Sequence, residues 1–215
     1  MNRKFVMSFS GGKDSTLALY RMINNGYEPV ALLMTFKVDE NKSWTHGINK
    51  ELILKIGESL QIPVILAECE AQNYEEKFEE ALKKAKKLGA EICVYGDIDI
   101  QEHRKWDKDR CDKVGMEAQF PLWQENREKL VFEFIDSGFK TIIKTVNLKY
   151  LNGEYLGKVM TKELALKIKD TGADMCGENG EYHTLVVDGP IFKNRINYEN
   201  HQKIISGNYG YLDIK

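Results

Sequence analysis

The segment Ser8-Phe9-Ser10-Gly11-Gly12-Lys13-Asp14-Ser15 decides the fold of this chain. An apolar run over residues 5–9 has the length of a buried strand, and residues 14–25 repeat apolar side chains with helical spacing. Between them, the paired glycines let main-chain N–H groups approach an anion, and the helix start adds partial positive charge. The segment therefore predicts a phosphate-binding loop made of Ser10, Gly11, Gly12, Lys13, Asp14 and Ser15.

The loop differs from the common nucleotide-binding motifs. Met7 stands where a Walker A loop needs its first glycine, and Asp14 stands where that motif needs serine or threonine. We expect Lys13 to be an exposed cation that contacts the phosphates, and therefore to be replaceable without unfolding the protein. Asp14 has two interpretations, a Mg²⁺ ligand or the N-cap of the helix, and both stay open at this point.

Apolar runs of strand length alternate with amphipathic runs of helix length through the first 120 residues. This alternation is typical of a parallel sheet covered by helices, so we predict an α/β fold with a doubly wound, mainly parallel five-stranded sheet. Further strands are expected at residues 30–36, 64–67, 92–95 and 118–120, and further helices at 50–60 and 74–88.

The carboxyl ends of the first, second and fourth strands are the expected nucleotide site, because open parallel sheets bind ligands in the crevice at that edge. We expect adenine to lie against the backbone around Met34. The ribose is expected close to Gly96 and Asp97, which follow the strand at residues 92–95.

The apolar spacing becomes irregular after Trp123, and we place a domain boundary there. Residues 1–124 are predicted to form the domain that carries the phosphate loop, and residues 125–215 a smaller α+β domain. Within the second domain, helices are expected at residues 126–137 and 161–170, and antiparallel strands at 182–187 and 207–214.

Composition excludes several classes of protein. Hydrophobic residues make up 42% and charged residues 30% of the chain, which is typical of a globular protein. A net charge of -2 argues against a broad nucleic-acid surface. No stretch has the length of a membrane span or of a secretory signal, so we expect a cytoplasmic protein without membrane contact. The four cysteines form no Cys-x-x-Cys pair and are expected to be buried, reduced thiols.

The motif Ser-Gly-Gly-Lys-Asp-Ser between a strand and a helix resembles the PP-loop of the N-type ATP pyrophosphatases, whose fold is adenine nucleotide alpha hydrolase-like. Further segments are similar to landmarks of the diphthine–ammonia ligase family, and the resemblance spans residues 4–193. These segments are Thr45-His46-Gly47, Tyr95-Gly96-Asp97-Ile98, Pro121-Leu122-Trp123, Gly177-Glu178-Asn179-Gly180-Glu181-Tyr182-His183-Thr184 and Val187-Asp188-Gly189-Pro190-Ile191-Phe192.

The resemblance implies an ATP-dependent ligase that forms AMP and pyrophosphate. Residues 1–124 would be its ATP-binding domain and residues 125–215 its substrate-binding domain. A carboxylate, on a small molecule or on a modified protein side chain, would be adenylated and then transferred to ammonia or a small amine, with ATP and Mg²⁺ as cofactors. Lys13, Asp14 and His183 are the implied catalytic residues, and Asp14 the implied metal ligand. The implied substrate-binding residues are His46, Gly47, His103, Arg104, Glu178, Asn179, Gly180, Glu181 and Thr184.

Two departures from the family pattern affect the substrate. Asn179 replaces a glycine and His183 replaces a glutamate of the C-terminal motif, and the run from His103 to Trp106 is absent from the ligase version. Both changes resemble a bacterial subgroup associated with cobalamin metabolism, so a cobalamin-pathway acid is an alternative substrate. A tRNA-modifying enzyme of the same superfamily and a nucleotide sensor without turnover are further alternatives, and a homodimer is left open.

Overall fold

The computed structural model describes residues 3–214, which form two compact units. The first unit contains residues up to 10 together with 14–124, and the second contains residues 11–13 together with 125–215. Three residues of the phosphate loop thus belong, by their contacts, to the second unit. None of the helices within residues 3–214 combines the length and apolar character that a bilayer span requires.

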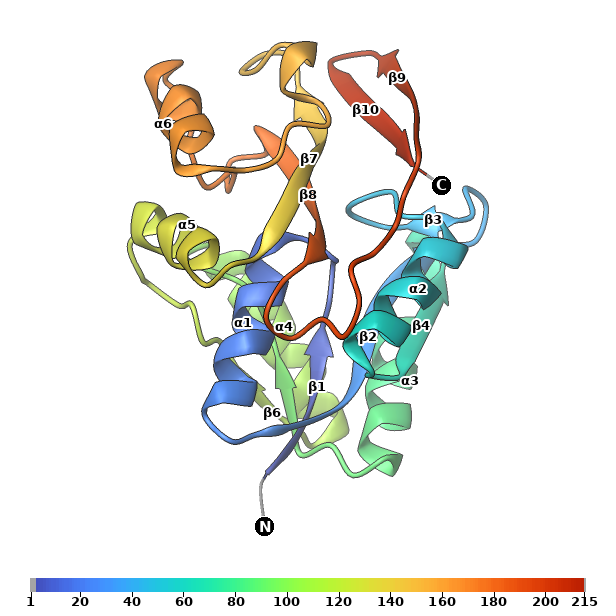
Figure 1. Cartoon of the computed structure of the whole chain (residues 1–215). Helices are drawn as coiled ribbons and strands as arrows, with labels where there is room; N and C mark the ends of the chain where they lie inside the picture. The colour runs from blue at the N-terminus through green and yellow to red at the C-terminus, as the bar shows by residue number, and fades with distance from the viewer. Residues whose placement is uncertain (1–2, 215) are drawn as a thin grey trace. The chain divides into compact units, whose positions relative to one another are not determined.

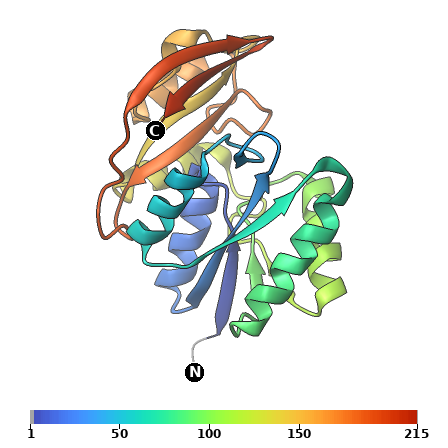
Figure 2. The same cartoon turned by 90° about the vertical axis from the view of Figure 1, so that its right-hand side faces the viewer.

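The first unit is built on a sheet of five parallel strands. They lie in the order β4-β2-β1-β5-β6, and the two-residue strand β3 pairs antiparallel with the end of β2. Helices α1 and α2 cover one face of this sheet, and α3 and α4 cover the other (Figure 2). The predicted doubly wound, mainly parallel five-stranded sheet is confirmed. The strands are β1 (Lys4–Ser8), β2 (Glu28–Lys37), β3 (Lys42–Ser43), β4 (Val64–Cys69), β5 (Ile92–Val94) and β6 (Glu117–Gln119), and the helices are α1 (Lys13–Asn24), α2 (Lys50–Leu60), η1 (Ala71–Asn73), α3 (Tyr74–Lys87) and α4 (Gln101–Val114).

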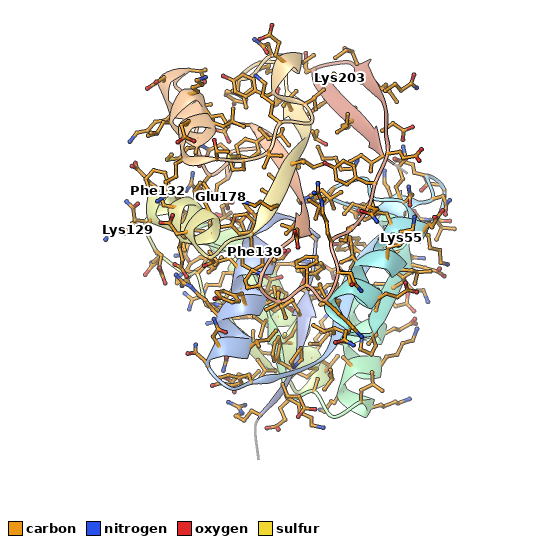
Figure 3. All side chains as sticks on the ribbon, in the orientation of Figure 1. Lys55, Lys129, Phe132, Phe139, Glu178 and Lys203 are labelled. Atoms are coloured by element: carbon orange, nitrogen blue, oxygen red, sulfur yellow. The ribbon has the colours of Figure 1, made fainter. Side chains whose placement is uncertain are left out.

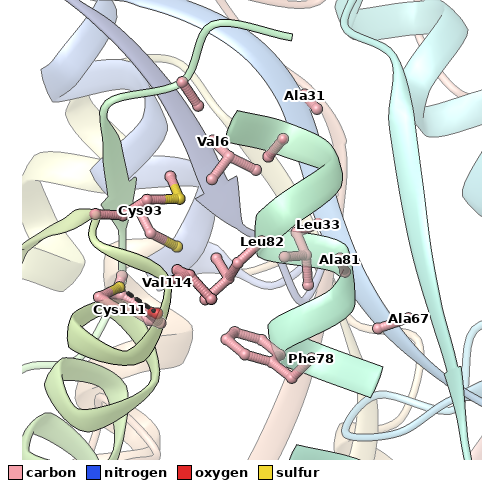
Figure 4. Close-up of a cluster of buried hydrophobic side chains, with 14 residues drawn as sticks. Val6, Ala31, Leu33, Ala67, Phe78, Ala81, Leu82, Cys93, Cys111 and Val114 are labelled. Atoms are coloured by element: carbon pink, nitrogen blue, oxygen red, sulfur yellow. Dashed lines mark hydrogen bonds between the residues drawn. The ribbon is translucent and has the colours of Figure 1, made fainter. Parts of the chain in front are cut away.

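Both faces of the sheet are buried, because successive apolar side chains of each strand point to opposite faces. Val6 and Leu33 pack with Phe78 and Leu82 of α3 in one hydrophobic cluster (Figure 4). Phe5, which lies next to Val6 in β1, is fully buried outside that cluster, as expected for alternate side chains of a strand. Such burial of both faces requires helices on both sides of the sheet, and the helical segments that alternate with the strands along the chain provide them.

The cysteines are free and buried, as predicted. Cys93 and Cys111 belong to the cluster between the sheet and helices α3 and α4 (Figure 4). The Tyr95 hydroxyl lies 3.2 Å from Cys111 Sγ. Burial raises the pKa of the Cys93 thiol well above its usual value, so this thiol is protonated at neutral pH.

The strand order places a topological switch point at β1. Its neighbours are β2 on one side and β5 on the other, and the chain continues outward to β4 and to β6. At such a point the connections leave in opposite directions and open a crevice at the carboxyl ends of the strands. The phosphate loop follows β1 directly, so this unit supplies the expected framework for a nucleotide site.

The second unit is an antiparallel sheet with two helices (Figure 1). Its strands lie in the order β8-β7-β10-β9, and the ion pairs Lys162–Asp136 and Lys169–Glu128 join the helices α5 and α6. The predicted smaller α+β part is confirmed. Its elements are α5 (Arg127–Asp136), β7 (Lys140–Asn147), η2 (Gly153–Tyr155), α6 (Lys162–Asp170), β8 (Tyr182–Asp188), β9 (Asn200–Ser206) and β10 (Tyr209–Ile214).

Aromatic packing closes the core of the second unit. Phe139, which is labelled in Figure 3, stacks on Phe134 with ring centroids 4.9 Å apart. The Phe139 ring also occupies the space that a side chain at position 189 would need, since a Cβ on Gly189 would lie 2.1 Å from it. Gly189 therefore allows the chain after β8 to pass close to the ring.

Strands β7 and β9 and most of helix α4 were not predicted. In β7 the lysines at positions 140 and 144 interrupt the apolar run, and every residue from 141 to 147 is nevertheless buried. Helix α4 has a mainly polar sequence, and only its spacing of Asp107, Cys111 and Val114 marks a buried face. Both elements depend on tertiary burial more than on a local pattern.

Candidate functional site

The phosphate loop joins β1 to α1 with a glycine in the left-handed region, Gly11 at φ 83°. The helix begins at Lys13, so Asp14 lies in its first turn and the interpretation of Asp14 as the N-cap is wrong. Ser10 N–H donates to Ser15 Oγ at 3.3 Å, and the two hydroxyls lie 3.1 Å apart. A carboxylate in the first turn is stabilised there by the free N–H groups of the helix start.

Gly96 brings the end of β5 against the start of α1. A Cβ at this position would lie 2.8 Å from Ser15 N and 2.9 Å from the Asp14 carbonyl carbon, closer than real Cβ atoms approach backbone. The first unit therefore gathers Ser10, Asp14, Ser15, Gly96 and Asp97 around the carboxyl ends of β1 and β5, the edge at which open parallel sheets bind ligands.

Met34 and His46 lie further along the first unit. Met34 is buried in the interior of β2, and the neighbouring Thr35 carbonyl already accepts a hydrogen bond from Trp44 N–H at 3.0 Å. His46 is buried in the turn after β3, where Gly47 takes a φ of 59° and its N–H donates to Ser43. This turn fixes the Thr45-His46-Gly47 segment at the end of β2.

Two carboxyl groups meet at the end of β5. The Asp107 carboxyl hydrogen-bonds Asp97, and burial together with the Asp97 charge raises the pKa of Asp107 to about 9. Asp107 therefore carries a proton at neutral pH. On the other side of Asp97, His103 Nδ1 lies 3.4 Å from Asp97 Oδ1 in an exposed position. A ribose hydroxyl or a metal ion would meet the Asp97 carboxyl group here, with Asp107 and His103 as its neighbours.

Arg104 stacks on aromatic rings. Its guanidinium carbon lies 4.5 Å from the centroid of the Trp123 ring and 5.5 Å from that of Phe120. Its Nε is buried without a hydrogen-bond partner among the described residues. Such stacking fixes the guanidinium plane while its remaining N–H groups stay available for an anion.

The second unit binds the middle of the phosphate loop. Lys13 N–H donates to Thr184 Oγ1 at 3.0 Å, and Val186 N–H donates to the Gly11 carbonyl at 2.9 Å. Lys13 Nζ lies 4.0 Å from Glu178 Oε1, which extends from the loop before β8 (Figure 3). The Lys13 ammonium also lies 5.8 Å from the centroid of the Tyr182 ring.

The expectation that Lys13 is exposed is wrong. Lys13 is 5% exposed, because β8 covers the loop from a position 171 residues away in the sequence. A buried ammonium interacts more strongly with a charged ligand than an exposed one, since less water screens it. It also depends on its partner Glu178 for compensation of charge.

The segment between α6 and β8 is shaped by Glu181. Its buried carboxylate accepts hydrogen bonds from Asp174 N–H at 3.1 Å, from Asn179 N–H at 3.0 Å and from Asn179 Nδ2 at 3.1 Å. Arg127 pairs with Asp174 at 2.5 Å and also contacts the Asn179 side chain. Glu181 and Asn179 therefore hold the segment in shape, and Glu178 is the carboxylate that this segment presents.

His183 lies on β8, next to Thr184. Burial, followed by the charges of Lys13 and Lys144, lowers the pKa of the His183 imidazole. A neutral imidazole at pH 7 can accept a proton. Gly180, at φ 82° with open space around its Cα, forms the turn that leads into this strand.

Candidate ligands for Mg²⁺ occur in each unit. Asp14 and Asp97 offer carboxylates in the first unit, and Glu178 offers one in the second. Mg²⁺ binds through one or two carboxylates together with phosphate oxygens and water, so the carboxylates of the first unit fit the ion.

Two residues of the site region were missed in the sequence. Asp107 shares the buried face of α4 with Cys111 and Val114, at positions i, i+4 and i+7, and that spacing could have identified it. Lys144 is 5% exposed in β7, and its surrounding Ile142-Ile143 and Val146 could have marked a buried strand.

Comparison with known proteins agrees on one family. Residues 3–118 match the diphthamide synthase N-terminal domain and residues 126–215 the diphthamide synthase C-terminal domain. The chain is 27% identical over 222 residues to the diphthine–ammonia ligase of Mus musculus, covering 91% of this chain and 83% of that protein. It is 29% identical over 236 residues to the diphthine–ammonia ligase of Schizosaccharomyces pombe, covering 99% of this chain and 39% of that protein.

A solved structure is also similar in part. It is described as a predicted subunit of tRNA methyltransferase from Methanocaldococcus jannaschii, with a TM-score of 0.45 and 15% identity, covering 91% of this chain and 100% of that one. This similarity is too distant to carry an inference about activity. The family matches, in contrast, cover both units and include the phosphate loop and the segment before β8. The chain therefore belongs to the diphthamide synthase family.

Proposed function

We propose that this chain is an ATP-dependent amide ligase that adenylates a carboxylate and transfers the acyl group to ammonia. One observation carries the proposal: the phosphate loop and the segment that ends in β8 share direct contacts, through Lys13 with Thr184 and Glu178. Lys13, which would bind phosphate, therefore directly contacts Thr184 and Glu178, which could orient a nucleophile. The diphthine–ammonia ligase name of the relatives supports this chemistry.

The first step would take place at the loop. A carboxylate oxygen attacks the α-phosphorus of ATP, a new P–O bond forms, and the bond to the departing pyrophosphate breaks. Negative charge grows on the pyrophosphate, and the loop N–H groups with the buried Lys13 ammonium stabilise it. Mg²⁺, held by Asp14 and phosphate oxygens, would supply further charge neutralisation.

The second step would use the side chains of β8 and of the segment before it. The nitrogen of ammonia attacks the acyl carbon, AMP leaves, and the nitrogen loses a proton. His183 is suited to accept this proton because its imidazole is neutral at pH 7. Glu178 would orient the nucleophile or a cationic group of the substrate, and Asn179, Gly180 and Glu181 would maintain the shape of the segment.

Residues of the first unit would bind the remainder of ATP and the substrate. Ser10, Ser15, Gly96 and Asp97 surround the carboxyl ends of β1 and β5, where the phosphates and ribose would lie, and Met34 lies beside the proposed adenine position. Arg104, with His103, His46 and Gly47, would contact the acid. Residues 1–124 would thus act as the ATP-binding part and residues 125–215 as the substrate-binding part, except that residues 11–13 join the second.

The substrate proposed first is diphthine, because the relatives carry diphthine in their name. In the family that the sequence resembles, diphthine is a side chain of translation elongation factor 2. Those names do not support a cobalamin-pathway acid, a tRNA or a sensor role. His183, in place of the glutamate expected in the family, is the residue whose chemistry would alter substrate choice.

The test is exchange of labelled pyrophosphate into ATP, followed by release of AMP, with diphthine-bearing elongation factor 2 and ammonia. Exchange that requires the modified factor is expected for the wild-type chain. Lys13→Met should abolish it, whereas Lys149→Met, which changes an exposed lysine of the second unit, should leave it intact. ATP binding without exchange, for any carboxylate offered, would contradict the proposal.

A further inference from the structure

We propose that Lys144 is a second phosphate-binding cation of the second unit and binds the phosphate chain of ATP together with Lys13. The inference rests on the proposed function, because it names a further binding residue of the same site. Lys144 lies on β7, in the second unit, within the matched C-terminal domain but outside the landmark segments quoted from the sequence.

The position of Lys144 is unusual for a lysine. Its side chain is 5% exposed, and its neighbours from position 141 to 147 are all buried. Lysine is almost never fully buried unless a charge compensates it, because removing an ammonium from water is costly. A buried lysine in the middle of a strand therefore indicates an ionic role.

An irregularity in the sheet places Lys144 between the β7 positions that pair with Thr184 and His183 of β8. Ile143 pairs with Thr184 and Thr145 pairs with His183, so β7 has one extra residue at this step, and that residue is Lys144. Such a bulge leaves two residues of one strand opposite one residue of the other and redirects a side chain. Bulges of this kind occur often next to active sites.

The bulge coincides with the attachment of the loop to β8. Thr184, the partner of Ile143, is the residue whose Oγ1 accepts the hydrogen bond from Lys13 N–H at 3.0 Å. The charges of Lys13 and Lys144 both act on the imidazole of His183. The two ammonium groups therefore lie near one side chain, although they come from opposite ends of the sequence.

The charges in this region favour an anion with several negative charges. Lys13 and Lys144 are two buried cations, and Glu178 is the carboxylate next to Lys13. The Glu181 carboxylate is occupied by three N–H donors of its own segment. Two cations held by separate strands and loops suit a polyphosphate better than a single carboxylate, since charges along a phosphate chain can meet both.

The experiment compares ligands and variants by isothermal titration calorimetry. Lys144→Met keeps the length and apolar stem of the side chain, and Lys144→Arg keeps the charge. Lys140→Met is the matched control, because Lys140 lies on the same strand and is exposed. Inorganic pyrophosphate, ATP and adenosine are the ligands, and the melting temperature of each variant is recorded.

We expect Lys144→Met to lower the affinity for pyrophosphate and for ATP about 10- to 100-fold, in line with loss of a charged hydrogen bond. The affinity for adenosine should not change. Lys144→Arg should retain most of the affinity, and Lys140→Met all of it. Wild-type affinity for pyrophosphate in Lys144→Met would overturn the inference. Equal losses for adenosine and pyrophosphate would also overturn it, because they would show a structural role.

A failure of the proposed function would look different. In that case the wild-type chain itself would bind ATP and pyrophosphate but give no exchange with any acid, while the effect of Lys144→Met on binding would persist. If Lys144→Met does not fold, the decision passes to Lys144→Gln, which also removes the charge: a folded glutamine variant that binds pyrophosphate about 10- to 100-fold more weakly, with unchanged adenosine binding, supports the inference. A folded glutamine variant with wild-type affinity for pyrophosphate contradicts it.

Discussion

Replacing Asp107 with asparagine should stabilise the protein at neutral pH and leave its stability unchanged in acid. The Asp107 carboxyl is 6% exposed, and its pKa rises from 3.8 to about 9 because of burial and of the neighbouring Asp97 charge. The folded protein therefore holds a proton that the unfolded chain releases above pH 4. The folded protein loses stability as the pH rises from the unfolded pKa of 3.8 towards the folded pKa of about 9, because the folded state binds one proton more than the unfolded chain.

The magnitude follows from the interval between the unfolded pKa and the working pH. From pH 4 to pH 7 there are three pH units, and each lowers the free energy of unfolding by about 1.4 kcal/mol. The buried Asp107 carboxyl therefore costs at most about 4 kcal/mol of stability at pH 7. Asparagine cannot ionise and can still donate a hydrogen bond to Asp97. We therefore expect Asp107→Asn to raise the free energy of unfolding by about 2–4 kcal/mol at pH 7, and by nothing measurable at pH 4.

Urea unfolding at pH 4, 5.5 and 7 measures this difference. Asp112→Asn is the control, because it removes an exposed carboxylate from the same helix. If the two variants show the same dependence on pH, the Asp107 carboxyl does not hold a proton in the folded state and the reasoning is refuted. A stabilised Asp107→Asn that also binds ATP less well would indicate that the acid is retained for its contact with Asp97.

Three further changes test the site by other means. Gly96→Ala should cost about 1–3 kcal/mol and weaken ATP binding, since its Cβ would meet backbone of α1, whereas Gly153→Ala, with open space around it, should be neutral; urea unfolding and calorimetry measure both. Glu181→Gln should destabilise the fold by about 1–3 kcal/mol, seen as a lower melting temperature, because it replaces a buried acceptor of three N–H groups with an amide. The lowered pKa of His183 predicts that wild-type stability falls as pH drops below about 6.5, because the unfolded chain takes up the proton first, and His183→Gln should show a smaller loss between pH 7.5 and 5.5.

Local pattern was sufficient for the framework of the fold. The helix predicted over residues 50–60 is α2, because its apolar spacing and the cap Asn49, which accepts from Leu52 N–H, are both local. The parallel sheet followed from strand-length runs separated by helices. The phosphate loop was recognisable because a glycine pair between a strand and a helix has a direct physical consequence for an anion.

The sequence was a poor guide where burial depends on distant residues. Lys13 looks exposed until Thr184 is known to bind its N–H, and the distance of 171 positions hides that contact. Lys144 interrupts an apolar run and so conceals β7, although the bulge makes its burial possible. Glu181 could be assigned to a motif, but its three hydrogen bonds within the segment appear only in the structure.

The assignment of residues 11–13 to the second unit has a consequence for recombination between genes of this family. A gene fragment that ends at residue 124 would encode the loop but omit Thr184 Oγ1 and Val186 N–H, the groups that bind Lys13 and Gly11. Recombination near the boundary would thus join each loop to a foreign β8 and disturb both. We therefore expect a substitution on β8 that removes either contact to require a matching change in residues 11–13.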